Sequence, residues 1–248
     1  MFIGSSLKMY FSHARTVQWM GAVAEQVKNH PALDAGIRPF MIPQYPSIAA
    51  CVAIGTGAGI AVGAQDLAAE DAGPYTGEVS GAVLAEVGCR YVEVGHAERR
   101  QLFGETDDVV AAKVFAAQRN GLVPLLCIGE QLPGDTVAAI AECRRQIDAG
   151  LTDARRAELT GPVIIAYEPL WAIGAPQPAS TEHIRAVCGS LQEFASKMPE
   201  SASLIYGGSA QPGMLTAVAD VVDGLFLGRF AHDPRAFVQI LDEALALV

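Results

Sequence analysis

A single acidic residue, Glu168, ends an apolar run that has the composition of a buried strand. Residues 163–167 read Val-Ile-Ile-Ala-Tyr, and Glu168 is followed at once by a proline and an apolar segment that closes on Gly174. A carboxylate at the exit of a buried strand is poorly solvated, which makes it a stronger base. The segment after it could cover the site and exclude water. This pattern predicts abstraction of a proton from a carbon beside a carbonyl group.

Other groups suited to such a reaction follow other apolar runs. Lys8 follows the first run and supplies a positive charge. His96 follows residues 91–94, where the start of a helix would lower its pKa and keep the ring neutral. A neutral imidazole can donate a hydrogen bond to a carbonyl or enediolate oxygen. The segment 207–209 (Gly-Gly-Ser) and Gly228 follow two later runs, and backbone N–H groups at such turns can bind phosphate.

The elements that must position these groups alternate along the chain. Apolar runs predict strands at residues 2–4, 39–42, 60–63, 91–94, 123–128, 163–167, 204–206 and 225–227. Amphipathic stretches predict helices at 14–28, 80–86, 107–120, 136–150, 181–197, 213–219 and 234–247, with a shorter candidate at 47–53. This alternation predicts an α/β fold, a (β/α)8 TIM barrel, in a single domain over residues 1–248. An open doubly wound sheet is less favoured because no Gly-x-Gly-x-x-Gly follows the first strand.

In a (β/α)8 barrel the active site forms at the C-terminal ends of the strands, so the candidate groups would share one mouth. Taken alone, each has an ordinary explanation. Lys8 could be a solvated lysine, His96 a core histidine, segment 207–209 a tight turn and Glu168 part of a buried ion pair. Their common position favours a functional site.

Composition excludes several classes of protein. The net charge of −10 argues against nucleic acid and membrane surfaces as partners, although a helix N-terminus can still attract a small anion. The five cysteines are scattered without a Cys-x-x-Cys pair, which predicts reduced core thiols in a cytoplasmic protein and neither a disulfide framework nor a zinc site. The first residues lack the blocks of a signal peptide, so none is expected.

Five motifs resemble the triosephosphate isomerase family, and the match as a whole runs from the first strand to the last helix. They are residues 91–100 (Tyr-Val-Glu-Val-Gly-His-Ala-Glu-Arg-Arg), 103–107 (Phe-Gly-Glu-Thr-Asp), 127–130 (Cys-Ile-Gly-Glu), 166–174 (Ala-Tyr-Glu-Pro-Leu-Trp-Ala-Ile-Gly) and 206–209 (Tyr-Gly-Gly-Ser). Segment 75–80 (Tyr-Thr-Gly-Glu-Val-Ser) is similar to the loop that this family inserts into a partner subunit. The resemblance therefore implies a homodimer, with Thr76 in the inserted loop.

The resemblance implies a proton transfer on a phosphorylated hydroxy-ketone, without cofactor or metal. Triosephosphate isomerase is a standard example of pKa tuning, and the residue roles given next are those of that family. Glu168 would be the base, His96 the electrophile, and Lys8 the cation that stabilises developing negative charge. The phosphate would meet the loops after the later strands, and residues 169–179 would form the lid. The residues expected at the phosphate are Gly174, Gly208, Ser209, Gly228 and Arg229. Glu98, paired with Lys8, and Cys127 would lie behind the reacting groups.

The chain departs from the family pattern around the substrate. Ser6 stands where the family has an asparagine that donates to the substrate, and Ala97 where it has a serine that holds the base. Residues 175–179 read Ala-Pro-Gln-Pro-Ala, and two prolines should alter lid closure. Arg229 replaces the second glycine after the last strand.

Ser6 at the asparagine position, together with Gly228 and Arg229 after the last strand, resembles the family branch that interconverts erythrulose 1-phosphate and erythrulose 4-phosphate. That substrate has one more CH2OH group than dihydroxyacetone phosphate, and Ser6 could leave room for it. Three alternatives remain open. The first is an ordinary triosephosphate isomerase, and the second is a non-catalytic phosphosugar-binding paralogue. The third is a Schiff-base aldolase, which needs a neutral Lys8.

Overall fold

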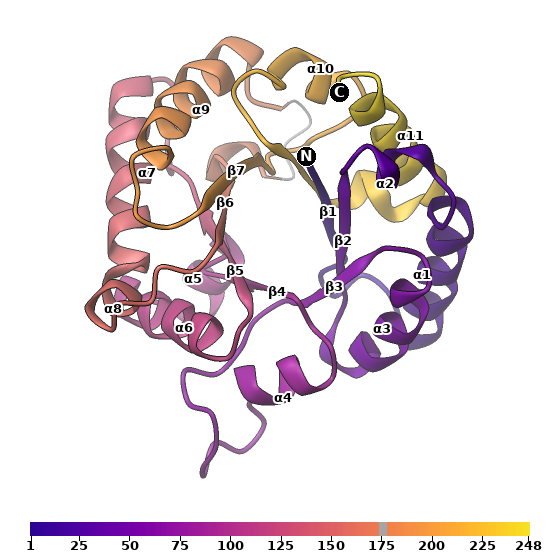
Figure 1. Cartoon of the computed structure of the whole chain (residues 1–248). Coiled ribbons are helices and arrows are strands. Elements are labelled where there is room, and N and C mark those ends of the chain that lie inside the picture. The colour runs from indigo at the N-terminus through magenta and orange to yellow at the C-terminus, as the bar shows by residue number, and fades with distance from the viewer. Residues whose placement is uncertain (174–177) are drawn as a thin grey trace.

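Parallel strands close into a barrel in the order of the sequence, with β8 paired to β1 (Figure 1). The computed structural model describes residues 1–173 and 178–248. The strands are β1 (Phe2–Ser6), β2 (Arg38–Ile42), β3 (Ala61–Ala64), β4 (Tyr91–Val94), β5 (Val123–Ile128), β6 (Val163–Tyr167), β7 (Ala202–Tyr206) and β8 (Gly224–Leu227). The predicted (β/α)8 TIM barrel is confirmed, and each predicted strand lies within two residues of the observed ends.

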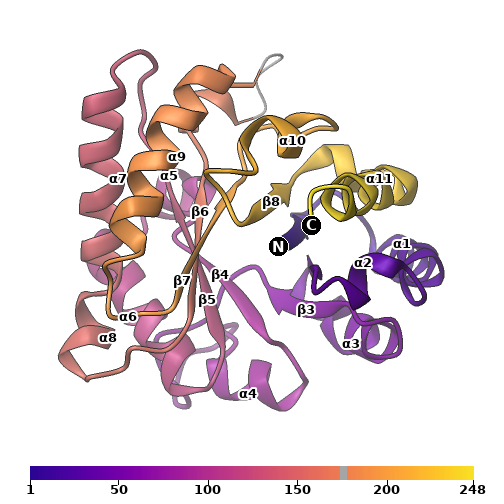
Figure 2. The ribbon, with the colours of Figure 1, turned by 45° about the horizontal axis from the view of Figure 1, so that its top comes forward.

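Helices surround the barrel on its outer side (Figure 2). They are α1 (His13–Val27), α2 (Pro31–Asp34), α3 (Ile48–Thr56), α4 (Gly81–Glu86), α5 (Ala97–Phe103), α6 (Asp107–Arg119), α7 (Thr136–Gly150), α8 (Thr152–Arg156), α9 (Thr181–Ala195), α10 (Met214–Val218) and α11 (Pro234–Leu245), with 3-10 turns η1 (Tyr45–Ser47), η2 (Leu170–Ala172) and η3 (Arg229–His232). The predicted helices are confirmed. The sequence missed α2, α5 and α8, which are short and lack a sustained apolar face.

The strands separate an inner core from an outer one, because successive side chains of a strand point to opposite faces. The inner cluster includes Phe40, Tyr91, Leu125 and Phe226, whereas Val92 of β4 packs in the outer cluster beneath the helices. Aromatic rings fill much of the interior: the rings of Phe40 and Phe226 stack 5.9 Å apart. The barrel is therefore a packed scaffold that presents its strand ends at a fixed mouth.

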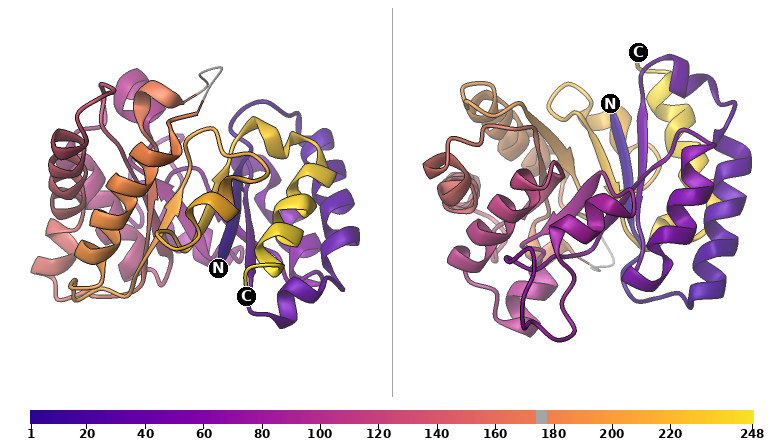
Figure 3. Two further views of the ribbon diagram at one scale, coloured as in Figure 1. Left: turned by 90° about the horizontal axis from the view of Figure 1, so that it is seen from above. Right: turned by 60° about the horizontal axis from the view of Figure 1, so that its bottom comes forward.

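A long loop between β3 and α4 projects beyond the ring of helices, as the purple segment shows in Figure 1 and Figure 3. Its base is held by the N–H of Ala68, which donates to the carbonyl of Val79 at 2.8 Å. Asp71 of the loop accepts hydrogen bonds from Arg119. The loop carries Thr76 at its exposed end and Tyr75, 44% exposed, beside it.

The five cysteines are all buried and unpaired. Across residues 1–173 and 178–248, no helix combines the length and apolar character needed to cross a bilayer.

Candidate active site

A cavity of about 350 Å³ opens at the C-terminal ends of β1, β6, β7 and β8. Its lining comprises Ser6, Lys8, Tyr10, Glu98, Glu168, Ile173, Gly207, Ser209, Ala210, Gln211, Phe226, Leu227, Gly228, Arg229 and Phe230. The barrel thus brings together side chains more than 200 positions apart in the sequence.

Most of the predicted site residues meet at this cavity. Those that line it are Ser6, Lys8, Glu98, Glu168, Ser209, Gly228 and Arg229. His96 lies beside it, with its Nε2 atom 3.3 Å from Oε2 of Glu168. Gly208, Cys127 and Thr76 do not line it. Gly174 and the lid residues 175–177 lie outside the described residues.

Glu168 is fixed at the exit of β6 by its backbone and by two glycines. Its N–H donates to the carbonyl of Ile128 at 2.8 Å, and its side chain is buried. A Cβ atom at Gly207 would lie 2.5 Å from Oε1 of Glu168, and one at Gly129 would collide with the backbone carbonyl of Glu168. Only glycine permits these approaches. Within the described part of the chain, Oε2 of Glu168 has no hydrogen bond of good geometry, so its lone pairs remain available.

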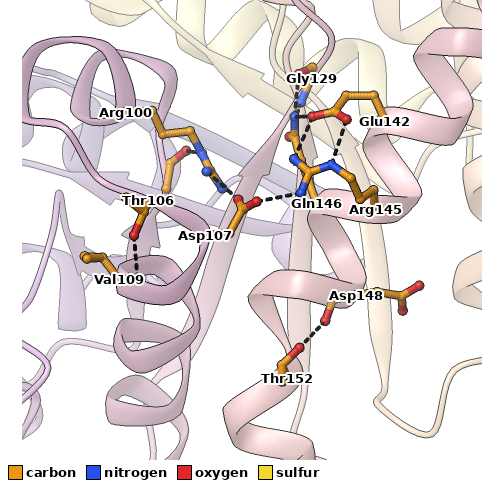
Figure 4. Close-up of polar contacts among 11 residues, drawn as sticks. Arg100, Thr106, Asp107, Val109, Gly129, Glu142, Arg145, Gln146, Asp148 and Thr152 are labelled. Atoms are coloured by element: carbon orange, nitrogen blue, oxygen red, sulfur yellow. Dashed lines mark hydrogen bonds and ion pairs between the residues drawn. The ribbon is translucent and has the colours of Figure 1, made fainter.

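A chain of polar contacts from α7 fixes the loop after β5 that carries Gly129 (Figure 4). Gln146 of α7 donates to the carbonyl of Gly129 and accepts from its N–H, both at 3.0 Å. Glu142 accepts a hydrogen bond of 2.7 Å from the same amide group. The backbone of Gly129 therefore cannot shift without breaking buried hydrogen bonds.

The same chain continues to the loop before His96. Arg145 pairs with Glu142 and, at 2.6 Å, with Asp107. Asp107 also pairs at 2.8 Å with Arg100, whose Nε donates to the carbonyl of Gly95 at 2.9 Å. This chain of contacts ties the backbone after β4, at Gly95, and after β5, at Gly129, to α7.

His96 occupies the position before the first residue of α5. The backbone N–H of Glu98 donates to Nδ1 of His96 at 3.1 Å, which leaves Nε2 to carry the proton of a neutral ring. Nε2 is the atom that faces Glu168. The predicted location at a helix N-terminus is therefore confirmed.

The predicted direction of the His96 pKa is wrong for this arrangement of charges. Burial lowers the pKa, but the carboxylates of Glu168 and Glu93 outweigh burial and raise the pKa to about 9. The sequence pattern identified the helix dipole but not the two carboxylates near the ring. Because Glu168 is the main cause of the increase, protonation of Glu168 would remove most of it.

Lys8 adopts a left-handed backbone with φ of 45°, which turns its side chain into the mouth. Its ammonium group pairs with Glu98 at 2.8 Å, as predicted. Burial lowers the pKa of Lys8, whereas the carboxylates of Glu168 and Glu98 raise it, and the net pKa lies above the ordinary value. A charged Lys8 does not suit Schiff-base chemistry, which needs a neutral amine.

Behind Ser6 lies a buried carboxyl group that the sequence did not single out. The hydroxyl of Ser6 donates to Oε2 of Glu93 at 2.9 Å, and Sγ of Cys127 lies 3.9 Å from Oε1. Burial raises the pKa of Glu93 above its usual range. It also raises the pKa of Cys127, so the thiol stays protonated. Cys127 thus lies behind the reacting groups, as expected.

The loops after β7 and β8 form the opposite wall. Ser209 has a left-handed backbone with φ of 51°, and its hydroxyl donates to the carbonyl of Ala172 at 2.8 Å. Gly208 packs against Tyr206 and Pro169 instead of the cavity. Arg229 is exposed, and it forms no ion pair within residues 1–173 and 178–248.

Sequence reasoning did not assign six of the lining residues to the site, namely Tyr10, Ala210, Gln211, Phe226, Leu227 and Phe230. Each lies one or two positions from a residue that was identified, so extension of each strand-end motif in both directions would have found them. In the part of the chain that the structure describes, no cluster of three His, Cys, Asp or Glu side chains could hold a metal ion.

Comparison with known proteins places these residues in a family. The profile of the family described as triosephosphate isomerase matches residues 1–244. An L-erythrulose-1-phosphate isomerase from Pectobacterium atrosepticum is 49% identical over 251 residues, covering 99% of this chain and 96% of that protein. A triosephosphate isomerase from Symbiobacterium thermophilum is 39% identical and covers 83% of each chain.

A solved structure agrees in fold. The triosephosphate isomerase from Bartonella henselae superposes with a TM-score of 0.82 at 28% identity, covering 98% of both chains.

Proposed function

The chain belongs to the triosephosphate isomerase family and is an isomerase, and from this premise we propose that its substrate is a four-carbon ketose phosphate. The reaction would interconvert L-erythrulose 1-phosphate and erythrulose 4-phosphate through an enediolate, without a cofactor. The similarity to an L-erythrulose-1-phosphate isomerase over 99% of the chain carries the choice of substrate. The position of Glu168 beside His96 at the cavity supports the chemistry.

Glu168 would be the general base. Its Oε2 atom would take the proton from the carbon beside the carbonyl and return it to the neighbouring carbon. The burial of Glu168, 6% exposed, and the lone pairs left on Oε2 support this role. Transfer of the proton neutralises the carboxylate in the same step.

His96 would donate from Nε2 to the carbonyl oxygen and move a proton between the two substrate oxygens. The hydrogen bond from the N–H of Glu98 to Nδ1 supports the required tautomer. Once Glu168 holds the substrate proton, the main cause of the raised His96 pKa is gone. The neutral ring, whose Nδ1 accepts from Glu98 and whose Nε2 holds the proton, is then no longer opposed by that carboxylate when the enediolate needs a hydrogen-bond donor.

Lys8 would stabilise the negative charge of the enediolate and of the phosphate. Its raised pKa and its ion pair with Glu98 support a permanent charge at the cavity. The phosphate would lie against the loops that carry Ser209, Gly228 and Arg229, with Gly208 supporting the turn. Gly174 is assigned to the same role from its motif alone.

Ser6 would make room for the added CH2OH group. It lines the cavity, and its side chain is shorter than the asparagine of the family motif. Ordinary triosephosphate isomerase activity on dihydroxyacetone phosphate remains the second candidate, supported by a relative of that name at 39% identity. A non-catalytic phosphosugar-binding paralogue is the third, and the presence of Glu168, His96 and Lys8 at one mouth argues against it.

A side-by-side isomerase assay tests the substrate. Purified protein should convert erythrulose 1-phosphate with a kcat/KM at least about tenfold above that for dihydroxyacetone phosphate, since one well-placed group contributes roughly 1 kcal/mol or more. Ser6→Asn should move this ratio toward the three-carbon substrate. A preference for dihydroxyacetone phosphate would identify a triosephosphate isomerase. Activity on neither, with retained phosphosugar binding, would identify the paralogue.

A homodimer would complete this face of the molecule. A cavity of about 390 Å³ next to the site is lined by Ser6, His96 and Glu93. Exposed apolar side chains border it, including Met9 (85% exposed) and Phe103 (68%). The projecting loop with Thr76 would fill this cavity in a second copy. Sedimentation of wild type and of a variant lacking residues 73–77 tests the dimer, and a monomeric wild type would contradict it.

We also propose a cytoplasmic location. Five buried, unpaired cysteines support a reducing compartment.

A further inference from the structure

Glu93 is a buried carboxyl group that the proposed reaction does not use. It follows the inward-facing Tyr91 by two positions on β4 and is 3% exposed. Within residues 1–173 and 178–248 it pairs with no lysine or arginine, and the nearest basic atom, Nε2 of His96, lies 3.9 Å away. Burial of a carboxyl group without a lysine or arginine partner destabilises the fold. A structural ion pair with a lysine or arginine therefore does not explain Glu93.

The hydrogen bond between Ser6 and Glu93 determines whether Ser6 can donate a hydrogen bond to a ligand or accept one from it. A serine hydroxyl has one proton and two lone pairs. Ser6 gives its proton to Oε2 of Glu93 at 2.9 Å, so only lone pairs remain for other partners. Ser6 also lines the cavity shared with Lys8 and Glu168. Oγ of Ser6 can therefore accept a hydrogen bond from a ligand in the cavity but cannot donate one.

Both protonation states of Glu93 are compatible with this polarity. An ionised carboxylate can only accept. A protonated Glu93 keeps Oε2 as an acceptor when its proton is on Oε1, the oxygen that faces Nε2 of His96 and Sγ of Cys127, each at 3.9 Å. With the carboxylate ionised, or with its proton on Oε1, the Ser6 proton stays directed into the barrel.

We infer that Glu93 is a positioning residue for substrate selection that acts through Ser6. By taking the Ser6 proton, it turns a Ser6 lone pair toward the cavity to accept a hydrogen bond from the terminal hydroxyl of the four-carbon substrate. This inference rests on the proposed function, which supplies that hydroxyl. Dihydroxyacetone phosphate lacks the added CH2OH group, so it cannot donate this hydrogen bond to Ser6.

The test compares erythrulose 1-phosphate with its 4-deoxy analogue, which lacks only the terminal hydroxyl. Wild type should use the analogue about tenfold less well in kcat/KM, since one hydrogen bond contributes roughly 1 kcal/mol. Glu93→Leu releases the Ser6 proton and should reduce this discrimination to about threefold or below. Tyr91→Phe, two positions earlier on β4, is the matched control and should keep the tenfold value.

Double substitution shows whether Glu93 acts through Ser6. Ser6→Ala should abolish the discrimination, and Ser6→Ala with Glu93→Leu should lose nothing beyond Ser6→Ala alone. Glu93→Gln is isosteric and replaces Glu93→Leu in both comparisons if the leucine variant does not fold. Its discrimination should lie between those of wild type and Ser6→Ala, again with no further loss in the double variant.

The inference is overturned by equal use of both substrates in wild type. Additive losses, or a Glu93 variant that slows both substrates in proportion, would also overturn it. Failure of the proposed function looks different, because wild type would then prefer dihydroxyacetone phosphate to erythrulose 1-phosphate.

Discussion

The mouth of the barrel carries the ends of β4, β5 and β6 on one side and those of β1, β7 and β8 on the other, and the two sides are held in different ways. On the first, here called the braced side, His96 and Glu168 sit on backbone tied to α7 through Gly129 and Gly95. On the second, here called the cavity wall, Tyr10, Gln211 and Arg229 are exposed.

This contrast separates two demands on an enzyme. Proton transfer needs its groups held to a fraction of an ångström, and the braced side supplies that rigidity through buried hydrogen bonds. Substrate fit depends on the volume and polarity of a wall, which single substitutions can change without disturbing the fold. A family can therefore keep one reaction and change its substrate.

The strongest challenge to the braced side is Glu168→Asp. It withdraws the carboxylate by roughly 1 Å, so kcat should fall at least about 100-fold. Affinity for inorganic phosphate, measured by competition, should stay nearly constant because the cavity wall is unchanged. Parallel losses of rate and phosphate affinity would show instead that Glu168 is needed for the structure of the mouth.

A pH titration probes the same side through His96. Its pKa in the folded protein is raised to about 9 from an ordinary 6.5. The folded state therefore gains stability that is fully present below about pH 6.5 and is lost as pH rises through about 9. The free energy of unfolding in urea should fall over this interval. The fall should be smaller in Glu168→Gln, which lacks the carboxylate that raises the pKa; equal falls would contradict this account.

Gln146→Leu tests the brace itself, at a distance from the substrate. Loss of both hydrogen bonds to Gly129 should lower kcat about tenfold with little change in KM, and lower Tm by several degrees. The matched control is Thr152→Val in α8, which removes an exposed hydrogen bond to the carbonyl of Asp148 in the last turn of α7 (Figure 4). A Gln146 variant with normal kcat would mean that the brace serves stability alone.

Arg229→Leu should have the smallest effect, because it alters the cavity wall only. KM for the phosphorylated substrate should rise about threefold, while kcat and Tm stay near wild type, since an exposed charge contributes little to folding. Arg156→Leu, an exposed arginine in α8 before β6, is the control and should leave KM unchanged. An Arg229 variant as slow as the Gln146 variant would remove the contrast between the two sides.

The sequence predicted the barrel well because its strands are short apolar runs of regular spacing. It missed α5, since Ala97–Phe103 is mostly polar and directly follows a strand. The spatial meeting of Lys8, Glu168 and Ser209 follows from the barrel rule alone, because such sites form at strand ends.

What local sequence could not supply were contacts between strands. Glu93 read as part of an apolar strand, and nothing near it in the sequence indicates that Ser6 would meet its carboxyl group. The direction of the His96 pKa was wrong for the same reason, because it depends on carboxylates from β4 and from the end of β6. Polarity and charge at a mouth depend on partners that only the folded chain brings together.

The left-handed backbone at Lys8 lowers the thermal stability of the protein at a position that the reaction needs. A lysine at φ of 45° costs on the order of 1 kcal/mol more than a glycine, which accepts that conformation freely. The partly exposed ion pair with Glu98 offsets little of that cost. Selection for heat resistance alone would therefore favour glycine at position 8. The resulting barrel would have a higher Tm but would lack the ammonium group of Lys8. Directed evolution of this scaffold needs a screen for turnover at every round.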